Sequence, residues 1–206
     1  MAISGIPILP VESISGNQFR AFRIIEEATQ TFYAGTPVSV AADGGIQAWN
    51  GTTFGGAGTQ GAVAGISYEA ASGLATTGKG APIPFSPIVG VGAAVGLFGH
   101  VQNQASAVNI AHGAPFNDGR VGFYPATADT VYSAILGNGG NPVTPAATDV
   151  GKTYSLSIDS AGVYWYVNRT VTTAVVVVVA LDLRDVPAAG TRVLFQFLPT
   201  QAYLIG

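Results

Sequence analysis

A run of five consecutive valines near the C-terminus constrains the fold more than any other feature of this sequence. The run lies within residues 174–181, AVVVVVAL, which are apolar throughout. A helix needs about 20 apolar residues to span a bilayer, so this segment is far too short to do so. An apolar run of β-branched residues without alternation is typical of a strand that is buried on both faces. We therefore expect Val175 to Val179 to form the central strand of a sheet.

Three further strand candidates surround the valine run. They are TYSLSI at 153–158, VYWYVN at 163–168 and RVLFQFL at 192–198. Their aromatic and β-branched content is the densest in the chain, as strands favour. The segment before them, ILGNGGNPVTPAATDVG at 135–151, has the Pro, Gly and Asn content of a linker or long loop. The sequence therefore predicts a C-terminal antiparallel β unit over residues 146–206, and we expect this unit to be the stability core.

Turn sequences also divide the first half of the chain into short strands. Asp43-Gly44-Gly45 can supply the positive φ angles of a tight hairpin between residues 37–40 and 46–49. Residues 18–28, QFRAFRIIEEA, alternate loosely between apolar and polar and favour a strand, although a helix stays open for 19–28. Short strands at this spacing indicate a small barrel or sandwich, here assigned to a β-rich domain over residues 19–145.

The N-terminal residues 1–18 show no sustained period and are broken by Gly5, Pro7 and Pro10. They are apolar but lack a basic region, so we do not expect a signal peptide. We expect an extended arm with nothing to pack on in its own chain, disordered in the free protein and ordered on a neighbouring subunit. Its apolar residues are then the candidate protein-interface residues. These are Ile3, Ile6, Ile8, Leu9, Val11 and Ile14. The predicted fold class is thus all-β, with small β-barrel or sandwich modules and an extended N-terminal arm.

Charged residues are scarce, at 9% of the chain against a usual value of about 25%. A soluble monomer normally uses more charge to keep its copies apart, so we expect partners to cover part of this surface. A Gly- and Ala-rich monomer that tolerates low charge is the alternative. The net charge is −3 and the basic residues are scattered, which does not favour nucleic acid as a partner. No membrane partner is expected, and the chain has no cysteine.

The sequence offers no convincing catalytic, cofactor or metal site. His100 and His112 are the only histidines, and their spacing matches no metal-ligand pattern. The glycine-rich stretch at 88–99, IVGVGAAVGLFG, lacks the Lys-Ser/Thr of a P-loop and misses the dinucleotide spacing. Asp182 and Asp185 bracket Arg184 after the valine run and are interpreted as edge charges that limit aggregation. We therefore expect no cofactor and no enzymatic activity.

Two stretches carry a resemblance to a known family. TFYAGTPVSVAADGGIQAWNG followed by GAVAGISYEAASG resembles the hairpin and strand at the core of capsid decoration (cement) proteins of tailed bacteriophages. DVGKTYSLSIDSAGVYWYVNRT, the valine run and GTRVLFQFL are similar to the C-terminal part of such head-associated structural proteins. Together the stretches cover about half of the chain, and residues 73–145 match nothing in this comparison.

The resemblance implies a virion protein that coats the outside of a phage head after synthesis in the host cytoplasm. Its implied partners are the major capsid protein and copies of itself, with a trimer preferred because shells offer three-fold sites. No catalytic residue is implied. Two alternatives stay open: a major coat or tail-tube subunit, and a host-facing carbohydrate-binding module. The second would use exposed aromatics of Tyr164, Trp165 and Tyr166.

Overall fold

The computed structural model describes residues 7–16, 21–25, 30–41, 44–51, 62–71, 120–170, 173–184 and 188–202. Within these ranges the chain is nearly all β, and its one helical element is the single 3₁₀ turn η3 (Ala147–Asp149). The all-β fold class is therefore confirmed. In the described part of the chain, no helix has the length and apolar character needed to cross a membrane.

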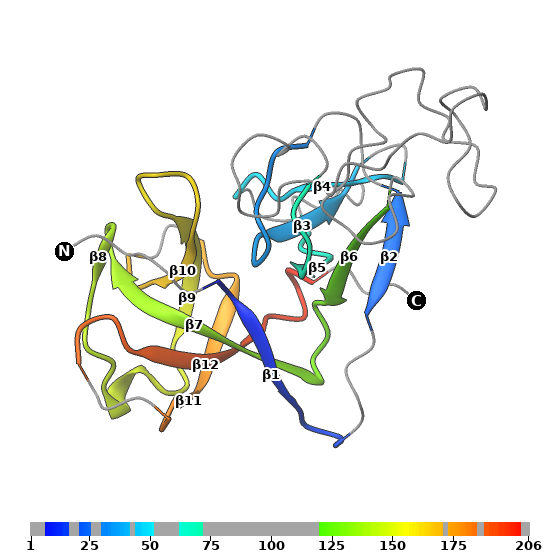
Figure 1. The fold of residues 1–206 in the computed structure, drawn as a ribbon. Coiled ribbons are helices and arrows are strands. Elements are labelled where there is room, and N and C mark those ends of the chain that lie inside the picture. Colours follow the sequence, from blue (N-terminus) through cyan, green and yellow to red (C-terminus); the bar gives the residue numbers. More distant parts are fainter. Residues whose placement is uncertain are drawn as a thin grey trace, which may run out of the picture.

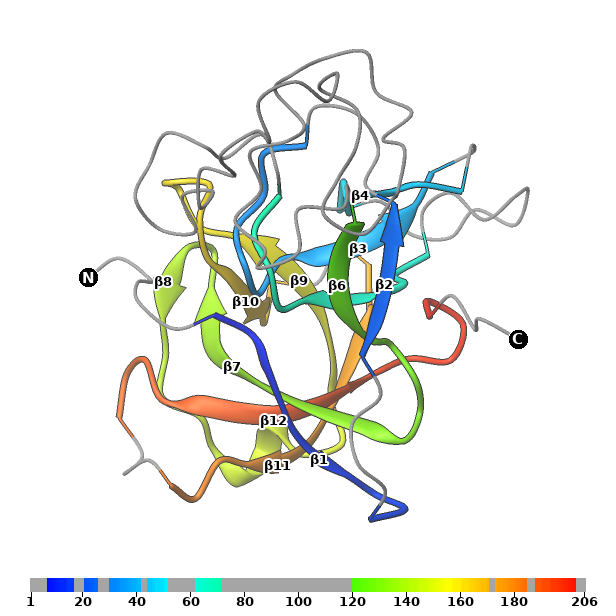
Figure 2. The ribbon, with the colours of Figure 1, turned by 45° about the vertical axis from the view of Figure 1, so that its right-hand side comes forward.

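Five strands close into a barrel. They are β7 (Thr130–Asn138), β9 (Thr153–Ile158), β10 (Trp165–Asn168), β11 (Val176–Leu181) and β12 (Arg192–Phe197). The ring runs β7-β10-β9-β11-β12 and returns to β7, because β7 pairs with β12 through residues 132–135 and with β10 through residues 136–137. The β7–β10 pair is parallel, and the other pairs in the ring are antiparallel. Figure 2 shows β7 and β12 side by side in this barrel. Closure leaves the ring without a free strand edge.

A second, antiparallel sheet lies beside the barrel (Figure 1). Its order is β2 (Phe22–Ile25), β6 (Arg120–Pro125), β5 (Gly65–Ser67), β3 (Pro37–Val40) and β4 (Ile46–Ala48). The predicted hairpin is confirmed as β3 and β4, with Val40 opposite Ile46. Gly44 takes a φ of +87°, and the Ala41 N–H donates to the Gly45 carbonyl at 2.7 Å. The strand favoured for residues 18–28 is confirmed over β2. Residue 21 is described but lies outside the strand, and residues 18–20 and 26–28 lie outside the described residues.

One hydrophobic core joins the barrel to the second sheet. Tyr132, Phe195 and Phe197 form its aromatic centre inside the barrel, with ring centroids 5.4–5.7 Å apart. Trp49 and Ile66, which come from the side of the second sheet, belong to the same buried cluster. A smaller buried cluster, which includes Phe123 of β6 and Val38 of β3, is formed by side chains of the second sheet and its neighbouring loops. The continuous main cluster means that the barrel side of the second sheet is buried by the barrel.

The valine run forms β11, but it is not buried on both faces as expected. Val176 and Val178 are fully buried, whereas Val177 and Val179 are only half-buried. β11 pairs with β9 and with β12, so it is flanked by two strands and is not an edge strand. Because it lies in a barrel wall, one face points into the core and the other points outward. A bulge between Val178 and Ala180 shifts the alternation along the strand.

The barrel does not begin at the predicted boundary of residue 146. Strand β7 supplies two of its pairings, and the short strand β8 (Asn141–Pro142) pairs with β7 beside the ring. Ile135 to Asn138, expected to start a linker, therefore continue a nine-residue strand whose first eight residues are buried. Local Gly and Asn content indicated a loop here, but the parallel pairing with β10 outweighs it because it buries Leu136 beside Val167.

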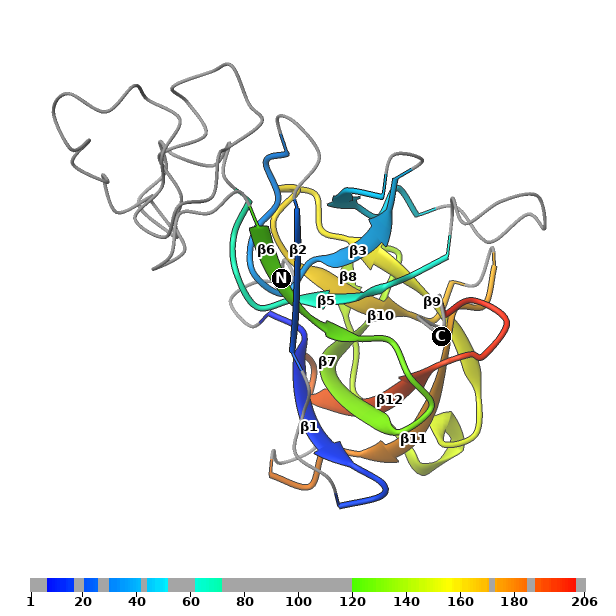
Figure 3. The ribbon, with the colours of Figure 1, turned by 90° about the vertical axis from the view of Figure 1, so that its right-hand side faces the viewer.

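The N-terminal residues run as an edge along both sheets. β1 (Leu9–Ser13) pairs antiparallel with residues 130–133, and β2 pairs antiparallel with residues 120–123. Segment 120–133 is therefore flanked on one side by the described parts of segment 7–25 (Figure 3). We call residues 7–16 and 21–25 the N-terminal ribbon. The expected arm with nothing to pack on is wrong for residues 7–16, since β1 pairs with β7 of its own chain and Ile8 is buried in its core.

Candidate interaction surface

The predicted interface residues differ in how far they are buried. Ile8 is fully buried in the main core, so its own chain uses the side chain that was expected to meet a partner. Leu9 is 45% exposed and Ile14 is 66% exposed, while Val11 is half-buried. Ile3 and Ile6 lie outside the described residues. An interface role thus remains a prediction for Leu9, Val11 and Ile14, which the structure brings together in and just after β1.

Ile8 is buried because the chain turns inward just before β1. Pro7 lies against Gly35, where an added Cβ would be 2.4 Å from the Pro7 Cβ. Gly35 also has a φ of +85°, which side-chain-bearing residues rarely adopt. This close backbone approach lets Ile8 enter the core between the sheets. The sequence signalled only an apolar residue between two prolines, which does not distinguish a core residue from an interface residue.

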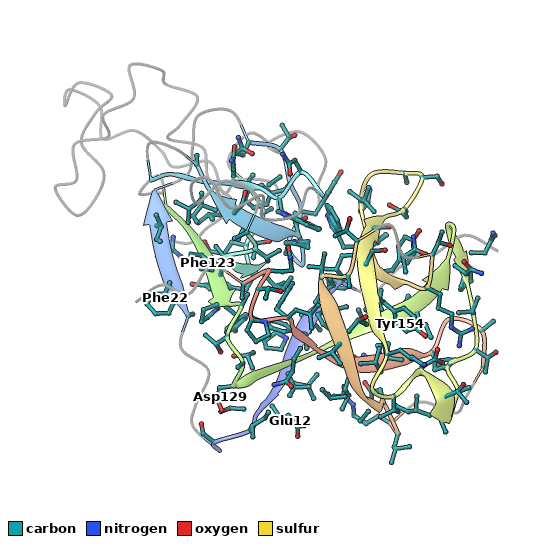
Figure 4. The ribbon with its side chains drawn as sticks, turned by 180° about the vertical axis from the view of Figure 1, so that it is seen from behind. Glu12, Phe22, Phe123, Asp129 and Tyr154 are labelled. Carbon is teal, nitrogen blue, oxygen red and sulfur yellow. The ribbon has the colours of Figure 1, made fainter. Side chains whose placement is uncertain are left out.

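A polar cluster fixes the end of β1 to the turn before β7. The Ser13 hydroxyl donates to the Asp129 carboxylate at 2.5 Å, and the Ser15 N–H and hydroxyl donate to it at 2.7 and 2.8 Å. The Ile14 N–H donates to the Asp129 carbonyl at 2.9 Å. The hydrogen bonds to its carboxylate, that of Ser13 foremost and then those of Ser15, lower the pKa of Asp129. Figure 4 shows Asp129 beside the β1 residue Glu12. The cluster joins residues 114 or more positions apart, so no local pattern could have predicted it.

The outer edge of β1 carries features that discourage the addition of another strand. Among the described residues β1 has β7 as its only neighbour, so it is an edge strand. Pro10 has no N–H to donate, and the register shifts between Pro10 and Glu12 as a bulge at Val11. Glu12 adds an exposed charge to the same strand. Proline, bulges and charges are the usual means by which edge strands avoid edge-to-edge pairing.

Exposed apolar side chains gather on the ribbon. Phe22 of β2 is 38% exposed and stacks on Phe123 with ring centroids 6.1 Å apart (Figure 4). Together with Leu9 and Ile14 it accounts for half of the large apolar residues that the described chain exposes. The others are Val150, Ile158 and Leu183. The ribbon therefore carries three of the six large apolar side chains that the described residues expose.

Asp149 and Arg169 form a bidentate ion pair that anchors the η3 turn to β10. The Arg169 Nε and Nη2 donate to Asp149 at 2.9 and 2.5 Å, and the Tyr154 hydroxyl and the Ala146 N–H donate to it at 2.7 Å each. The side chain of Asp149 is almost completely buried. Burial alone would raise the pKa of Asp149, but these hydrogen bonds lower it overall. The pair acts within the chain and leaves no free carboxylate.

Asp182 is also buried, which corrects its interpretation as an edge charge. Its side chain is 2% exposed and accepts hydrogen bonds from Ser133 at 2.9 Å and from Arg184 at 2.7 and 2.5 Å. Arg192 lies 3.7 Å away on β12. Hydrogen bonds from Arg184 are the main cause that lowers the pKa of Asp182 to about 2. The cluster ties the end of β11 to β7 and β12. Asp185 lies outside the described residues.

Most of the charged side chains that the structure describes are therefore used for internal contacts. Arg23 pairs with Glu69, whose other oxygen accepts the Gly122 N–H at 3.0 Å. Among the charged side chains that the structure describes, which exclude that of Arg120, only those of Glu12 and Lys152 have neither an ion pair nor a hydrogen bond. The described surface therefore carries even fewer unpaired charges than the low content of charged residues in the sequence indicates.

The aromatic segment VYWYV is mostly buried. Trp165 and Tyr166 are 8% and 3% exposed, which leaves only Tyr164 half-exposed. A carbohydrate would therefore find no exposed aromatic platform on this strand. The described residues also contain no group of three or more His, Cys, Asp or Glu side chains that could hold a metal ion. His100, His112 and the glycine-rich stretch at 88–99 lie outside the described residues.

Comparison with family models, curated proteins and solved structures found no match to this chain.

Proposed function

We propose that this chain is a non-enzymatic structural protein that decorates and stabilises a phage capsid by binding the coat-protein lattice and copies of itself. The observation that carries the proposal is the internal use of charge. Carboxylates such as Asp149 and Asp182 are buried against arginines, so little free charge remains to keep copies or partners apart. A surface of this kind fits a protein that works in a dense assembly.

The resemblance in sequence supports the same proposal from a second direction. The segment that resembles the decoration-protein hairpin folds as β3 and β4, with the turn at Gly44 and Gly45. The segments that resemble the C-terminal part of head proteins form β9 to β12. The exposed residues Leu9 and Ile14 supply apolar contact area for a partner.

Binding to phage heads tests this function directly. Heads assembled without the chain would be mixed with the purified protein, sedimented, and analysed for the amount bound per coat subunit. We expect saturable binding at a fixed ratio and a higher temperature of head disruption. No saturable binding, or binding without any gain in head stability, would contradict the proposal.

Matched variants can locate the contact. Leu9→Asp with Ile14→Asp places charges on the ribbon, and we expect it to weaken head binding at least tenfold. Val150→Asp with Ile158→Asp is the control, since these two side chains are 44% and 42% exposed and lie elsewhere. Equal loss of binding in both pairs would point to a general effect of charge and away from a contact at β1.

A further inference from the structure

The N-terminal ribbon is held to the molecule by contacts that do not depend on which chain supplies it. Its two strands pair with the single segment 120–133. The polar contacts of residues 13–15 gather on Asp129 of that segment, and Arg23 of β2 pairs with Glu69. Ile8 and Pro7 add one buried side chain and one contact to Gly35. The same set of contacts forms whether the ribbon comes from its own chain or from a second copy.

The position of the ribbon makes such an exchange topologically simple. Its described residues precede β3 in the chain, and β1 and β2 are end strands of the two sheets. Removal of the ribbon therefore leaves every pairing within the barrel ring and among β3 to β6 intact. Exchange of an identical element between copies is a low-cost route to oligomers, because it reuses contacts already present in the monomer.

β1 has an inner edge, which pairs with β7, and an outer edge, which has no neighbour among the described residues. The two edges differ in a way that favours exchange of β1 between copies over the addition of another strand to its outer edge. Pro10, the bulge at Val11 and the Glu12 charge protect the outer edge. The inner edge carries the pairing of residues 9, 10, 12 and 13 with β7, and the hydrogen bonds to Asp129 follow it. Association of two copies through this strand would therefore use the inner edge. The exposed Leu9, Ile14 and Phe22 lie on the same ribbon.

We propose that copies of this chain associate by exchanging the N-terminal ribbon, so that β1 and β2 of one copy pair with residues 120–133 of a second copy. The Asp129 cluster then recognises the turn at Ser13 to Ser15 of the neighbour. The partner is a second copy of this chain, and each copy completes the core of its neighbour with Ile8. This inference rests on the self-association in the proposed function.

Engineered disulfides test the exchange, because the chain has no cysteine of its own. Ser13 and Thr130 face each other across the β1–β7 pair, and both are close to cysteine in size. Ser13→Cys with Thr130→Cys would be oxidised in the oligomer fraction and run on a denaturing, non-reducing gel. We expect covalent dimers or trimers that collapse to monomers on reduction. Ser15 retains its two hydrogen bonds to Asp129 in this variant.

Val177→Cys with Gln196→Cys is the control. These two residues face each other across the β11–β12 pair in the barrel wall, which does not involve the ribbon. We expect it to give an internal disulfide and a monomeric band. As a second measurement, tagged Ser13→Cys and untagged Thr130→Cys proteins would be unfolded together and refolded, and we expect disulfide-linked heterodimers.

Several outcomes would overturn the exchange. A monomeric band from oxidised Ser13→Cys/Thr130→Cys, no disulfide there while the control forms one, or only monomer by light scattering at tens of micromolar would each do so. If oligomers persist with a monomeric band, exchange fails while the proposed function stands. If covalent oligomers form but do not bind phage heads, the exchange stands while the proposed function fails.

Discussion

Trp49 and Trp165 pack against each other with ring centroids 5.5 Å apart, and they are the only two tryptophans in the chain. Trp49 follows β4 of the second sheet, and Trp165 begins β10 of the barrel. Both belong to the main hydrophobic cluster. The contact therefore joins the two β units, and tryptophan emission reports directly on whether they stay together.

Unfolding of the two units should be cooperative because they share this core. We expect the tryptophan emission and the far-ultraviolet circular dichroism to change in one coincident transition with denaturant. Trp49→Ala should lower the free energy of unfolding by about 3–5 kcal/mol, the usual cost of deleting a large buried aromatic. Two separated transitions in the wild-type chain would show that the sheet and the barrel unfold independently.

Neighbouring valines in β11 should differ sharply in their tolerance to charge. Val178→Asp places an unpaired carboxylate in the core, and we expect a loss of several kcal/mol, a large part of the typical 5–15 kcal/mol total. Val177→Asp places it on the half-buried outer face and should cost much less. Melting temperatures of the two variants make the comparison. Equal losses would mean that both faces of β11 are covered.

The Asp182 cluster predicts a specific loss of stability in acid. Its pKa of about 2 in the folded state lies below the value of about 3.9 expected for the unfolded chain. The stabilisation is therefore complete above about pH 4 and is lost as the pH falls towards 2. Chemical denaturation from pH 5 to pH 2 would measure it. Asp182→Asn should be less stable at pH 5 and show a shallower decline, and parallel curves would exclude this role for Asp182.

Two glycines in the second sheet should respond differently to alanine. A Cβ at Gly65 would lie 2.0 Å from the Tyr124 carbonyl oxygen, which is backbone, whereas a Cβ at Gly122 would meet the Tyr68 ring. Gly65→Ala should therefore destabilise the fold severely. Gly122→Ala should be partly rescued by Tyr68→Ala, which removes the obstructing ring. Thermal melts of the three proteins would decide this, and a Gly65→Ala protein that melts like wild type would contradict the β5–β6 packing.

The Asp129 cluster should control local opening of β1. Asp129→Ala removes the acceptor for Ser13 and Ser15, and we expect amide exchange in residues 9–14 to accelerate at least tenfold. Amides of β9 serve as the internal control and should keep their protection. Unprotected β1 amides already in the wild-type protein would support the disordered arm that the sequence predicted, against the paired strand in the structure.

Local sequence determined much of the strand inventory of this protein. Residues 153–158 form β9 as expected, and the hairpin of β3 and β4 turns at the predicted glycines. The valine run became β11 because β-branched side chains favour extended backbone wherever they are placed. These features depend on residues within one strand or one turn, so periodicity and turn chemistry suffice to predict them.

Tertiary structure alone decided the pairing, the burial and the candidate surface. The ribbon pairs residues 9–13 and 22–25 with residues 120–133, and closure of the barrel pairs β7 with β10 and β12, so both join segments that are far apart in the chain. Which face of β11 is buried, and that Asp182 lies inside, depend on neighbours from β7 and β12. A sequence records that Ile8 is apolar and Asp182 is charged. Whether such side chains meet core, partner or solvent depends on which distant segments pack around them.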